Sequence, residues 1–464
     1  MTTASGTPPA VTPASPLGRF VRPFAALTEP NYRWIWIGQL SASIGRSMRS
    51  YLRLFLVYEL TGSAVWLGIV QGSLALPFLF LTFWGGVFAD KFDRRRLLVT
   101  TEIMLVFLWA IVSTFIVTGL INEWWLAGAA ILSGTVQSFS RPARMALVPN
   151  VVSRQNLPNA VALEAMAQSG GTLVGPAIGG VLAAIAFIDI GGAFWVTTFL
   201  QAITVLSLFT IRWDFQGEMP AARQSAGRTF VEGLRYMKGD VLILGLVMMG
   251  AAGSLFAGSY HSLLPVFAKR VWDVGEVGFS GMQAAGGVGG LIGAFLVANL
   301  DRYPKKGRLL VGGGLAFGGL LVGFAISPTF ALALFVLAVI GFASMLFMTV
   351  NNTAIQLVIP DEVRGRVMSV MMMTFGLMPL GAVPASVAAE SLGVRSVVAV
   401  GGILCVASML AIYYVMPAFR SLDRQLEEGR ERETERRRAK SAEDATEAAV
   451  HTKGGRAVAA TESR

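Results

Sequence analysis

The chain has 464 residues, of which 54% are apolar and only 14% are charged. In a soluble protein of this length, about a quarter of all residues are charged, so the composition excludes an ordinary soluble domain. Long stretches such as 65–89, 97–120 and 309–327 hold almost no charge. Runs of about twenty apolar residues match the roughly 30 Å hydrocarbon core of a bilayer, and we therefore predict an all-α membrane protein.

Several functional classes are disfavoured by the same counts. The net charge of +10 lies mostly between apolar stretches, where bases set membrane orientation, so we expect no nucleic-acid partner. One cysteine, Cys405, and two histidines, His261 and His451, exclude thiolate and histidine metal clusters. No stretch reads as a phosphate-binding loop, and the glycine-rich string 286–293 lies inside an apolar span, where helix packing is expected. We expect no metal, no cofactor and no enzyme activity.

In chain order, residues 1–33 are expected to form a disordered or amphipathic cytoplasmic N-terminus, since they lack an apolar core. The apolar stretches predict six spans at 34–58, 65–89, 97–118, 124–147, 160–186 and 190–211, and six more at 241–268, 276–299, 309–327, 330–352, 367–389 and 394–416. A polar connector, 212–240, separates the two sets. A charged tail, 417–464, is expected to be cytoplasmic and largely disordered.

A repeated loop divides the chain into halves. Residues 90–96 (DKFDRRR) and 301–308 (DRYPKKGR), about two hundred residues apart, each run from an acid through a base and an aromatic into a basic cluster. This repeat predicts twelve transmembrane helices in two pseudo-symmetric halves, 34–211 and 241–416. Alternate loops differ in charge, and one set holds only Lys269, Arg270 and Arg395 as bases. That set is predicted to be outside, which places both termini in the cytoplasm.

The loop after the second span carries a recognisable motif. Gly86 is followed after three residues by Asp90, then a base, and then the pair Arg94 and Arg95. This spacing resembles the signature loop of the major facilitator superfamily. The resemblance implies an inward gate, in which Asp90 meets the start of the eleventh span beside Arg366. The alternative is that these bases only set topology.

A second motif lies in the fifth predicted span. Its residues are Gly171, Gly175, Pro176, Gly179 and Gly180. Their spacing resembles the antiporter motif of the same superfamily, and it implies an exporter. Proline bends a helix and glycines let neighbouring helices approach, which makes a tight and bendable seam. The alternative is small-residue packing without antiport.

Four short stretches narrow the resemblance further. Residues 58–63, 141–144, 159–160 and 360–367 together resemble the multidrug and macrolide efflux branch that includes enterobactin exporters, over roughly 20–416. The resemblance implies export of a drug, a macrolide-like molecule or a siderophore-like metabolite.

Charged residues inside the first span indicate the substrate's chemistry. Arg46, Arg49 and Arg53 share one helical face, and Arg46 falls near mid-membrane. A midplane arginine costs about 3 kcal/mol, so it is expected to face water or an acid. We interpret it as favouring a carboxylate, catecholate or phosphate group, while the alternative pairs Arg46 with a protein acid. The residues predicted to line a substrate cavity are Arg46, Arg49, Gln71, Gln283 and Asn352.

Few groups are candidates for proton coupling. They are Glu164 in the fifth span, His261 in the seventh, and Asp90 near the inner surface, where Glu102 also lies. Structural roles for His261 and Glu164 are the alternative.

The sequence therefore predicts a monomeric secondary transporter in the plasma membrane. Its partners are the lipid bilayer, protons and a small amphipathic substrate, which it exports by proton antiport with alternating access. Proton-coupled uptake of an organic anion and a non-transporting receptor are the two alternatives.

Overall fold

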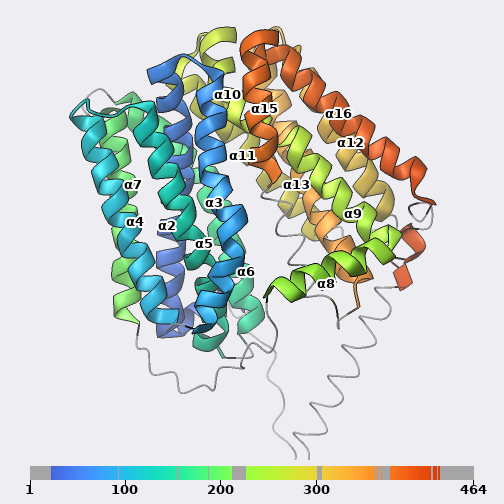
Figure 1. The fold of residues 1–464 in the computed structure, drawn as a ribbon, viewed down its shortest axis with the longest axis horizontal. Coiled ribbons are helices and arrows are strands. Elements are labelled where there is room, and N and C mark those ends of the chain that lie inside the picture. The colour runs from blue at the N-terminus through green and yellow to red at the C-terminus, as the bar shows by residue number, and fades with distance from the viewer. Residues whose placement is uncertain are drawn as a thin grey trace, which may run out of the picture. The chain divides into compact units, whose positions relative to one another are not determined.

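A computed structural model describes residues 22–91, 94–153, 156–185, 188–211, 226–299, 306–360 and 377–417, together with 363, 367, 419, 422–425, 427 and 428. Within these ranges the chain is helical almost throughout and contains no strand (Figure 1). The all-helical class predicted from composition is thereby confirmed.

The helices of the first sequence half follow one another with short turns. They are η1 (Arg22–Thr28), α2 (Pro30–Thr61), α3 (Ala64–Lys91), α4 (Arg94–Val117), α5 (Glu123–Val151), α6 (Leu157–Ala184) and α7 (Asp189–Thr210). Residues 22–33, which were predicted to belong to a disordered or amphipathic N-terminus, form η1 and the first turn of α2.

The second half begins with α8 (Ala226–Gly239), a helix inside the predicted polar connector. Asp240 ends it and caps the next helix, because its carboxylate accepts hydrogen bonds from the backbone of Leu242 and Ile243 at 3.0 and 3.1 Å. The helices that follow are α9 (Val241–Ala252), η2 (Gly253–Ala257), α10 (Tyr260–Val266), η3 (Phe267–Val271), α11 (Gly275–Asn299), α12 (Lys306–Ala325), α13 (Phe330–Val358), α15 (Leu377–Leu392) and α16 (Val394–Val415). Both η2 and η3 are π-helical turns, so α9 to η3 form one long composite rod.

Seven helices among the described residues are long and apolar enough to cross a membrane. They are Arg95–Val117, Asp189–Thr210, Val241–Val271, Gly275–Leu296, Lys306–Ala325, Phe330–Val358 and Val394–Val415. The predicted eleventh span is described only at Val367 and from Leu377 onward, and most of the second loop repeat, 301–305, lies outside the described residues. The count of twelve spans stays a prediction.

Contacts divide the chain into two compact units. Unit 1 comprises Met1–Arg53, Phe80–Trp125 and Leu132–Ala222, and unit 2 comprises Leu54–Leu79, Leu126–Ile131 and Arg223–Arg464. The last part of α2, the first part of α3 and a short segment near the start of α5 thus belong with the later helices.

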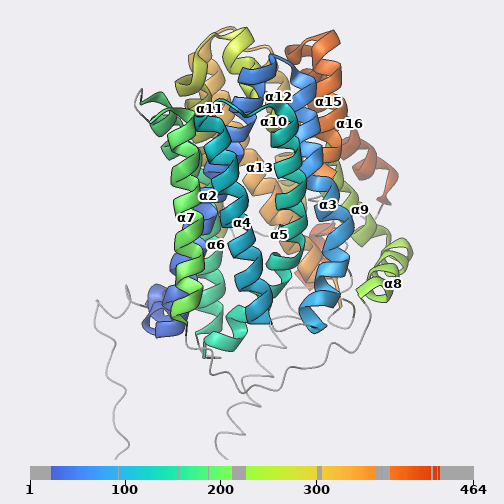
Figure 2. The ribbon, with the colours of Figure 1, turned by 60° about the vertical axis from the view of Figure 1, so that its left-hand side comes forward.

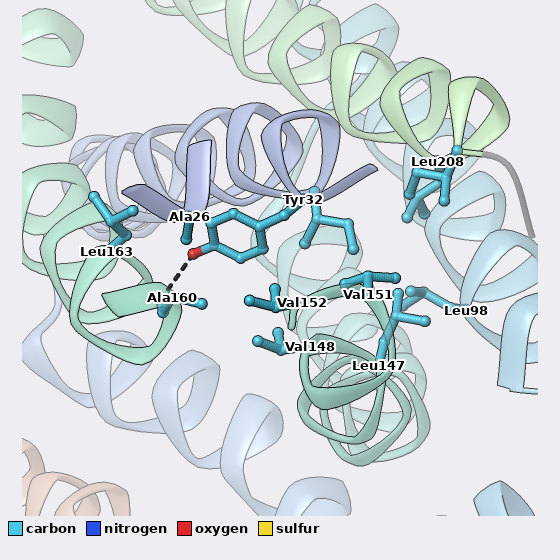
Figure 3. Close-up of a cluster of buried hydrophobic side chains, with 12 residues drawn as sticks. Ala26, Tyr32, Leu98, Leu147, Val148, Val151, Val152, Ala160, Leu163 and Leu208 are labelled. Carbon is cyan, nitrogen blue, oxygen red and sulfur yellow. Dashed lines mark hydrogen bonds between the residues drawn. The ribbon is translucent and has the colours of Figure 1, made fainter. Parts of the chain in front are cut away.

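Unit 1 is organised around the buried ring of Tyr32 (Figure 3). Its hydroxyl donates a 2.8 Å hydrogen bond to the Ala160 carbonyl oxygen, and side chains from η1, α4, α5, α6 and α7 surround it. In the same unit, α4 and α7 pack side by side along their lengths (Figure 2). This core fixes the start of α2, and therefore the depth of the arginines that follow on that helix.

Glu29 fastens η1 to the turn between α5 and α6. Its carboxylate accepts hydrogen bonds from Ser153 Oγ at 2.7 Å and from Asn156 Nδ2 at 2.8 Å. Burial alone would raise the pKa of Glu29, but the hydrogen bonds from Asn156 and Ser153 outweigh it and hold the pKa below its ordinary value. The attachment therefore contributes stability at neutral pH that is lost as the pH falls through the folded-state pKa.

Unit 2 is built on close helix contacts. α11 packs along α13, and α12 packs against both α13 and α16. A Cβ on Gly289 would lie 1.7 Å from the Ala338 carbonyl oxygen, and one on Gly341 would lie 1.9 Å from the Gly286 oxygen. The glycine-rich string of α11 thus serves helix packing, as expected, because only a residue without a side chain permits this approach.

Candidate functional site

A buried ion pair lies in the middle of unit 1. Glu102 of α4 and Arg144 of α5 form it, with Arg144 Nη2 lying 2.5 Å from Glu102 Oε1. Gln201 of α7 donates from Nε2 to the other carboxylate oxygen, and Arg144 Nη1 donates to Gln39 Oε1 of α2 at 3.0 Å. Four helices are thus joined through one carboxylate, and both of its oxygens accept a hydrogen bond.

Arg49 extends this arrangement along α2. Its Nη2 donates to Gln201 Oε1 at 3.1 Å, and its guanidinium lies 4.4 Å from the centre of the Trp109 ring. Thr197 accepts from Nη1 through its hydroxyl oxygen at 3.4 Å. Arg49 is therefore enclosed between α2, α4 and α7. We call Gln39, Arg49, Glu102, Arg144 and Gln201 the buried polar network.

Glu164 of α6 borders the network. Its Oε1 is buried and has no hydrogen-bond partner among the described residues. Arg144 and Arg46 both act on it electrostatically, and Glu164 in turn acts on Tyr32. Glu164 was predicted as a proton-coupling candidate, and the arginine that pairs with Glu102 acts on it electrostatically.

Positive charge exceeds negative charge in this part of unit 1. The charged residues concerned are the arginines Arg46, Arg49, Arg53 and Arg144 and the glutamates Glu102 and Glu164. Among the residues that the structure describes here, four bases against two acids leave a formal excess of two positive charges. Since unbalanced charge is costly at membrane depth, an anionic group is the chemistry that complements this cluster.

The glycine motif of α6 lies directly against α2. A Cβ on Gly171 would meet Ser43 Oγ at 2.3 Å, one on Gly175 would lie 2.8 Å from the Ile44 oxygen, and one on Gly179 would lie 3.0 Å from Met48. Pro176 and Gly180 are also buried. The motif thus brings the helix that carries Glu164 against the helix that carries the three arginines.

The inward gate predicted from the signature loop lies largely outside the described side chains. Gly86 and Asp90 belong to the last two turns of α3, and Arg94 and Arg95 begin α4. Arg95 is exposed, the surroundings of the other three are not described, and Arg366 is itself outside the described residues.

Unit 2 contains a cluster of charges that the sequence analysis missed. Lys269 Nζ lies 2.5 Å from Glu59 Oε2, and Arg270 lies 3.7 Å from Glu390 Oε1. Arg270 also donates to the Gly62 carbonyl oxygen at 2.5 Å. Glu390 Oε2 accepts a hydrogen bond at 2.8 Å from the backbone nitrogen of Ala64, the first residue of α3. We call Glu59, Lys269, Arg270 and Glu390 the α2–α3 turn cluster.

This cluster ties a turn of the first sequence half to the ends of η3 and α15. Lys269 and Arg270 were counted only as loop bases, although the acids Glu59 and Glu390 occupy comparable helix ends. The two acids were the feature of the sequence that could have suggested this cluster. Sequence spacing alone, however, does not show which helix ends lie next to one another.

Two other predicted residues meet in unit 2. His261 of α10 forms a side-chain hydrogen bond with Gln283 of α11, and the Tyr260 ring centre lies 4.1 Å from that of His261. Gln71 of α3 and Asn352 of α13 are half-buried. Within unit 1, Arg46 is also half-buried. The five predicted cavity residues are thus divided between the units, two in unit 1 and three in unit 2.

We expect Gly175→Ala to lower the melting temperature of the detergent-solubilised protein, since the added methyl group must displace the α2 backbone. Overpacking of this kind costs about 1–3 kcal/mol. Gly170→Ala is the matched control on the same helix, because a Cβ there meets nothing within 4 Å. Equal melting temperatures for the two variants would show that the α6–α2 contact is not tight.

The chain matches a family model over most of its length. The family is described as "Transmembrane secretion effector", and the match covers residues 21–438. A staphyloferrin A transporter of Staphylococcus aureus is 26% identical over 410 residues, which cover 85% of this chain and 94% of the relative. The multidrug efflux pump Tap of Mycolicibacterium fortuitum is 25% identical over 402 residues, 84% of this chain and 96% of the pump. The enterobactin exporter EntS of Shigella boydii is 26% identical over 322 residues, 66% of this chain and 70% of the exporter.

Solved structures show the same fold. The nucleoside transporter NupG superimposes with a TM-score of 0.65 at 12% identity, covering 83% of this chain and 98% of NupG. A bacterial homologue of the human lysosomal transporter Spinster, in an inward-facing and unoccupied conformation, gives a TM-score of 0.62 at 15% identity, covering 86% of this chain and 98% of the homologue. At these identities the likeness concerns the fold alone.

Proposed function

We propose that this chain, which belongs to the transmembrane secretion effector family of the major facilitator superfamily, exports a small amphipathic molecule with anionic character. The superfamily resemblance carried by the sequence motifs is confirmed. The chain is a multi-pass membrane transporter and not an enzyme. The proposal concerns the class of its substrate, the coupling of transport to protons and the direction of transport.

The observation that carries the proposal is the excess of arginine over glutamate in unit 1. Ionisable residues at membrane depth are costly and are retained where they bind or conduct something. Siderophore-like molecules with carboxylate or catecholate groups fit a positively charged cluster. Two of the relatives are named after siderophores: the staphyloferrin A transporter and the enterobactin exporter. A third is named as a multidrug pump.

The proposed mechanism is alternating access driven by inward proton flow across the plasma membrane. Twelve helices in two halves rock about the substrate, with both termini cytoplasmic and one chain acting alone. Asp90 and the segment at Arg366 hold the inner side closed in one state. Arg46 contacts the substrate from unit 1, while the enclosed Arg49 contributes its positive charge without direct contact. Gln71, Gln283 and Asn352 are the proposed substrate contacts within unit 2. The glycines of α6 form a seam that moves with α2.

The α2–α3 turn cluster is proposed to close the outer side in the other state. It joins the Gly62 turn to two helix ends through charged groups that are only half-buried. Exposed ion pairs contribute up to about 1 kcal/mol each, which suits a contact that must form and break in every cycle.

Transport in inverted membrane vesicles separates the candidate functions. Export predicts that labelled enterobactin or staphyloferrin A accumulates in the vesicle lumen when a proton gradient is imposed, and that a protonophore abolishes the accumulation. Loss from preloaded vesicles would favour proton-coupled uptake. No flux of these substrates or of a panel of drugs would favour a non-transporting receptor.

We expect Arg46→Gln to lower the export rate of an anionic substrate about tenfold relative to a neutral congener, because a charge-assisted hydrogen bond is worth about 1.5–3 kcal/mol. Competition between the two labelled substrates measures the ratio. Arg33→Gln is the matched control, since Arg33 is an exposed arginine on the same helix. An unchanged ratio in Arg46→Gln would remove the assigned anion preference.

For the α2–α3 turn cluster, we expect Glu59→Lys and Lys269→Glu each to slow export several-fold, since each places two like charges face to face. The double variant Glu59→Lys with Lys269→Glu restores the pair and is expected to recover most of the rate. The initial rates of export in vesicles, corrected for the amount of protein, are compared between the wild type, the single variants and the double variant. A double variant as slow as either single one would contradict a role for the pair.

A further inference from the structure

One arginine in unit 1 serves two acids on different helices. Arg144 of α5 pairs with Glu102 of α4 at 2.5 Å, and it also attracts Glu164 of α6. Arg144 is mostly buried, with 13% of its side chain exposed. In a low-dielectric interior, it is costly to keep two carboxylates ionised together when both depend on the same guanidinium for compensation.

The two acids are unequally supplied with hydrogen bonds. Both oxygens of Glu102 accept, one from Arg144 and the other from Gln201. Glu164 has a buried Oε1 with no partner among the described residues. A buried carboxylate oxygen without a donor is costly as an anion, whereas a protonated carboxyl group loses little there. The surroundings of Glu164 therefore favour a proton on its carboxyl group.

The groups that face Glu164 limit what else can set its charge. They are Arg46 and Tyr32 from α2 and Arg144 from α5. Glu102 is faced by Arg144 and, through Gln201, by Arg49. Among the described residues, Arg144 acts on Glu164 and also forms the ion pair with Glu102. Arg144 is therefore the group through which a change of charge on one acid reaches the other.

We propose that Glu164 carries the transported proton and that Arg144 exchanges between Glu102 and Glu164 as this proton is taken up and released. With the proton on Glu164, Arg144 is held by Glu102, which is the arrangement observed. When the O–H bond of Glu164 breaks, the proton leaves to water, and the new carboxylate competes with Glu102 for the Nη–H groups of Arg144. Uptake of a proton from water reverses both changes.

Coupling in this scheme is conformational. The acid that holds Arg144 decides whether α5 is tied to α4 or to α6, and α6 lies against α2 along its glycines. The proton and the substrate need not compete for one group, so an anionic substrate is compatible with the scheme. The inference rests on the proposed function, because it names the coupling group of that transport cycle.

A first test does not depend on transport. Infrared spectra of the purified full-length protein at neutral pH are expected to show the carbonyl band of a protonated carboxyl group. Glu164→Gln should remove this band, whereas the half-buried control Glu123→Gln should leave it. Glu102→Gln should weaken it, because Arg144 is then free to stabilise the Glu164 carboxylate. The same band in Glu164→Gln as in the wild type would overturn the proposal, and so would its absence from the wild type.

A second test separates coupling from a structural role. In proteoliposomes, exchange of labelled for unlabelled enterobactin without a gradient requires binding and the conformational change but no net proton transfer. Glu164→Gln is expected to keep this exchange within about twofold of the wild type and to lose accumulation driven by a proton gradient. Glu123→Gln should keep both activities.

The outcomes of the second test are distinguishable from failure of the proposed function. If the wild type itself fails to accumulate the substrate, the function is wrong and the infrared result still decides the protonation of Glu164. If the wild type accumulates substrate and Glu164→Gln does so equally well, the coupling role is wrong and export stands. Loss of exchange as well as accumulation in Glu164→Gln would assign a structural role and overturn the proposal.

Discussion

The ion pair between Glu102 and Arg144 constrains the rest of unit 1. Removing one partner of such a buried pair costs about 3–5 kcal/mol, because the other charge stays behind without compensation. The pair is therefore surrounded by groups that complete its hydrogen bonds, Gln201 on one side and Gln39 on the other. Through them α2, α4, α5 and α7 are held at fixed depths relative to one another.

Packing supports these polar contacts at both ends of unit 1. The Tyr32 core fixes the start of α2, while the glycines of α6 let that helix lie against the α2 backbone (Figure 3). A helix surface built from glycine offers no side chains to interlock, so it can shift with little steric cost. In the proposed transport cycle, this glycine contact between α6 and α2 is the seam that moves.

The α2–α3 turn cluster of unit 2 differs from the buried network in how strongly it holds. Its charges are one-third to one-half exposed, so water and salt weaken them, whereas Glu102 is almost fully buried. In the proposed cycle, the exposed turn cluster opens and closes with the outer side of the transporter. The buried network stays together in that cycle except for the exchange of Arg144 between Glu102 and Glu164.

The sequence by itself determined the all-helical membrane class, because hydrocarbon admits only long apolar segments with internally paired backbones. It also indicated Glu164 and His261 as candidates for proton coupling and the α6 glycines as a helix contact, because such residues are unusual within apolar segments. Only the tertiary structure showed that Arg144 of α5 pairs with Glu102 of α4. It also showed that Arg49 is enclosed by Trp109, Thr197 and Gln201 rather than simply facing water. Pairing of this kind depends on the rotation and depth of separate helices. Spacing along one helix says nothing about these, because packing between helices sets them.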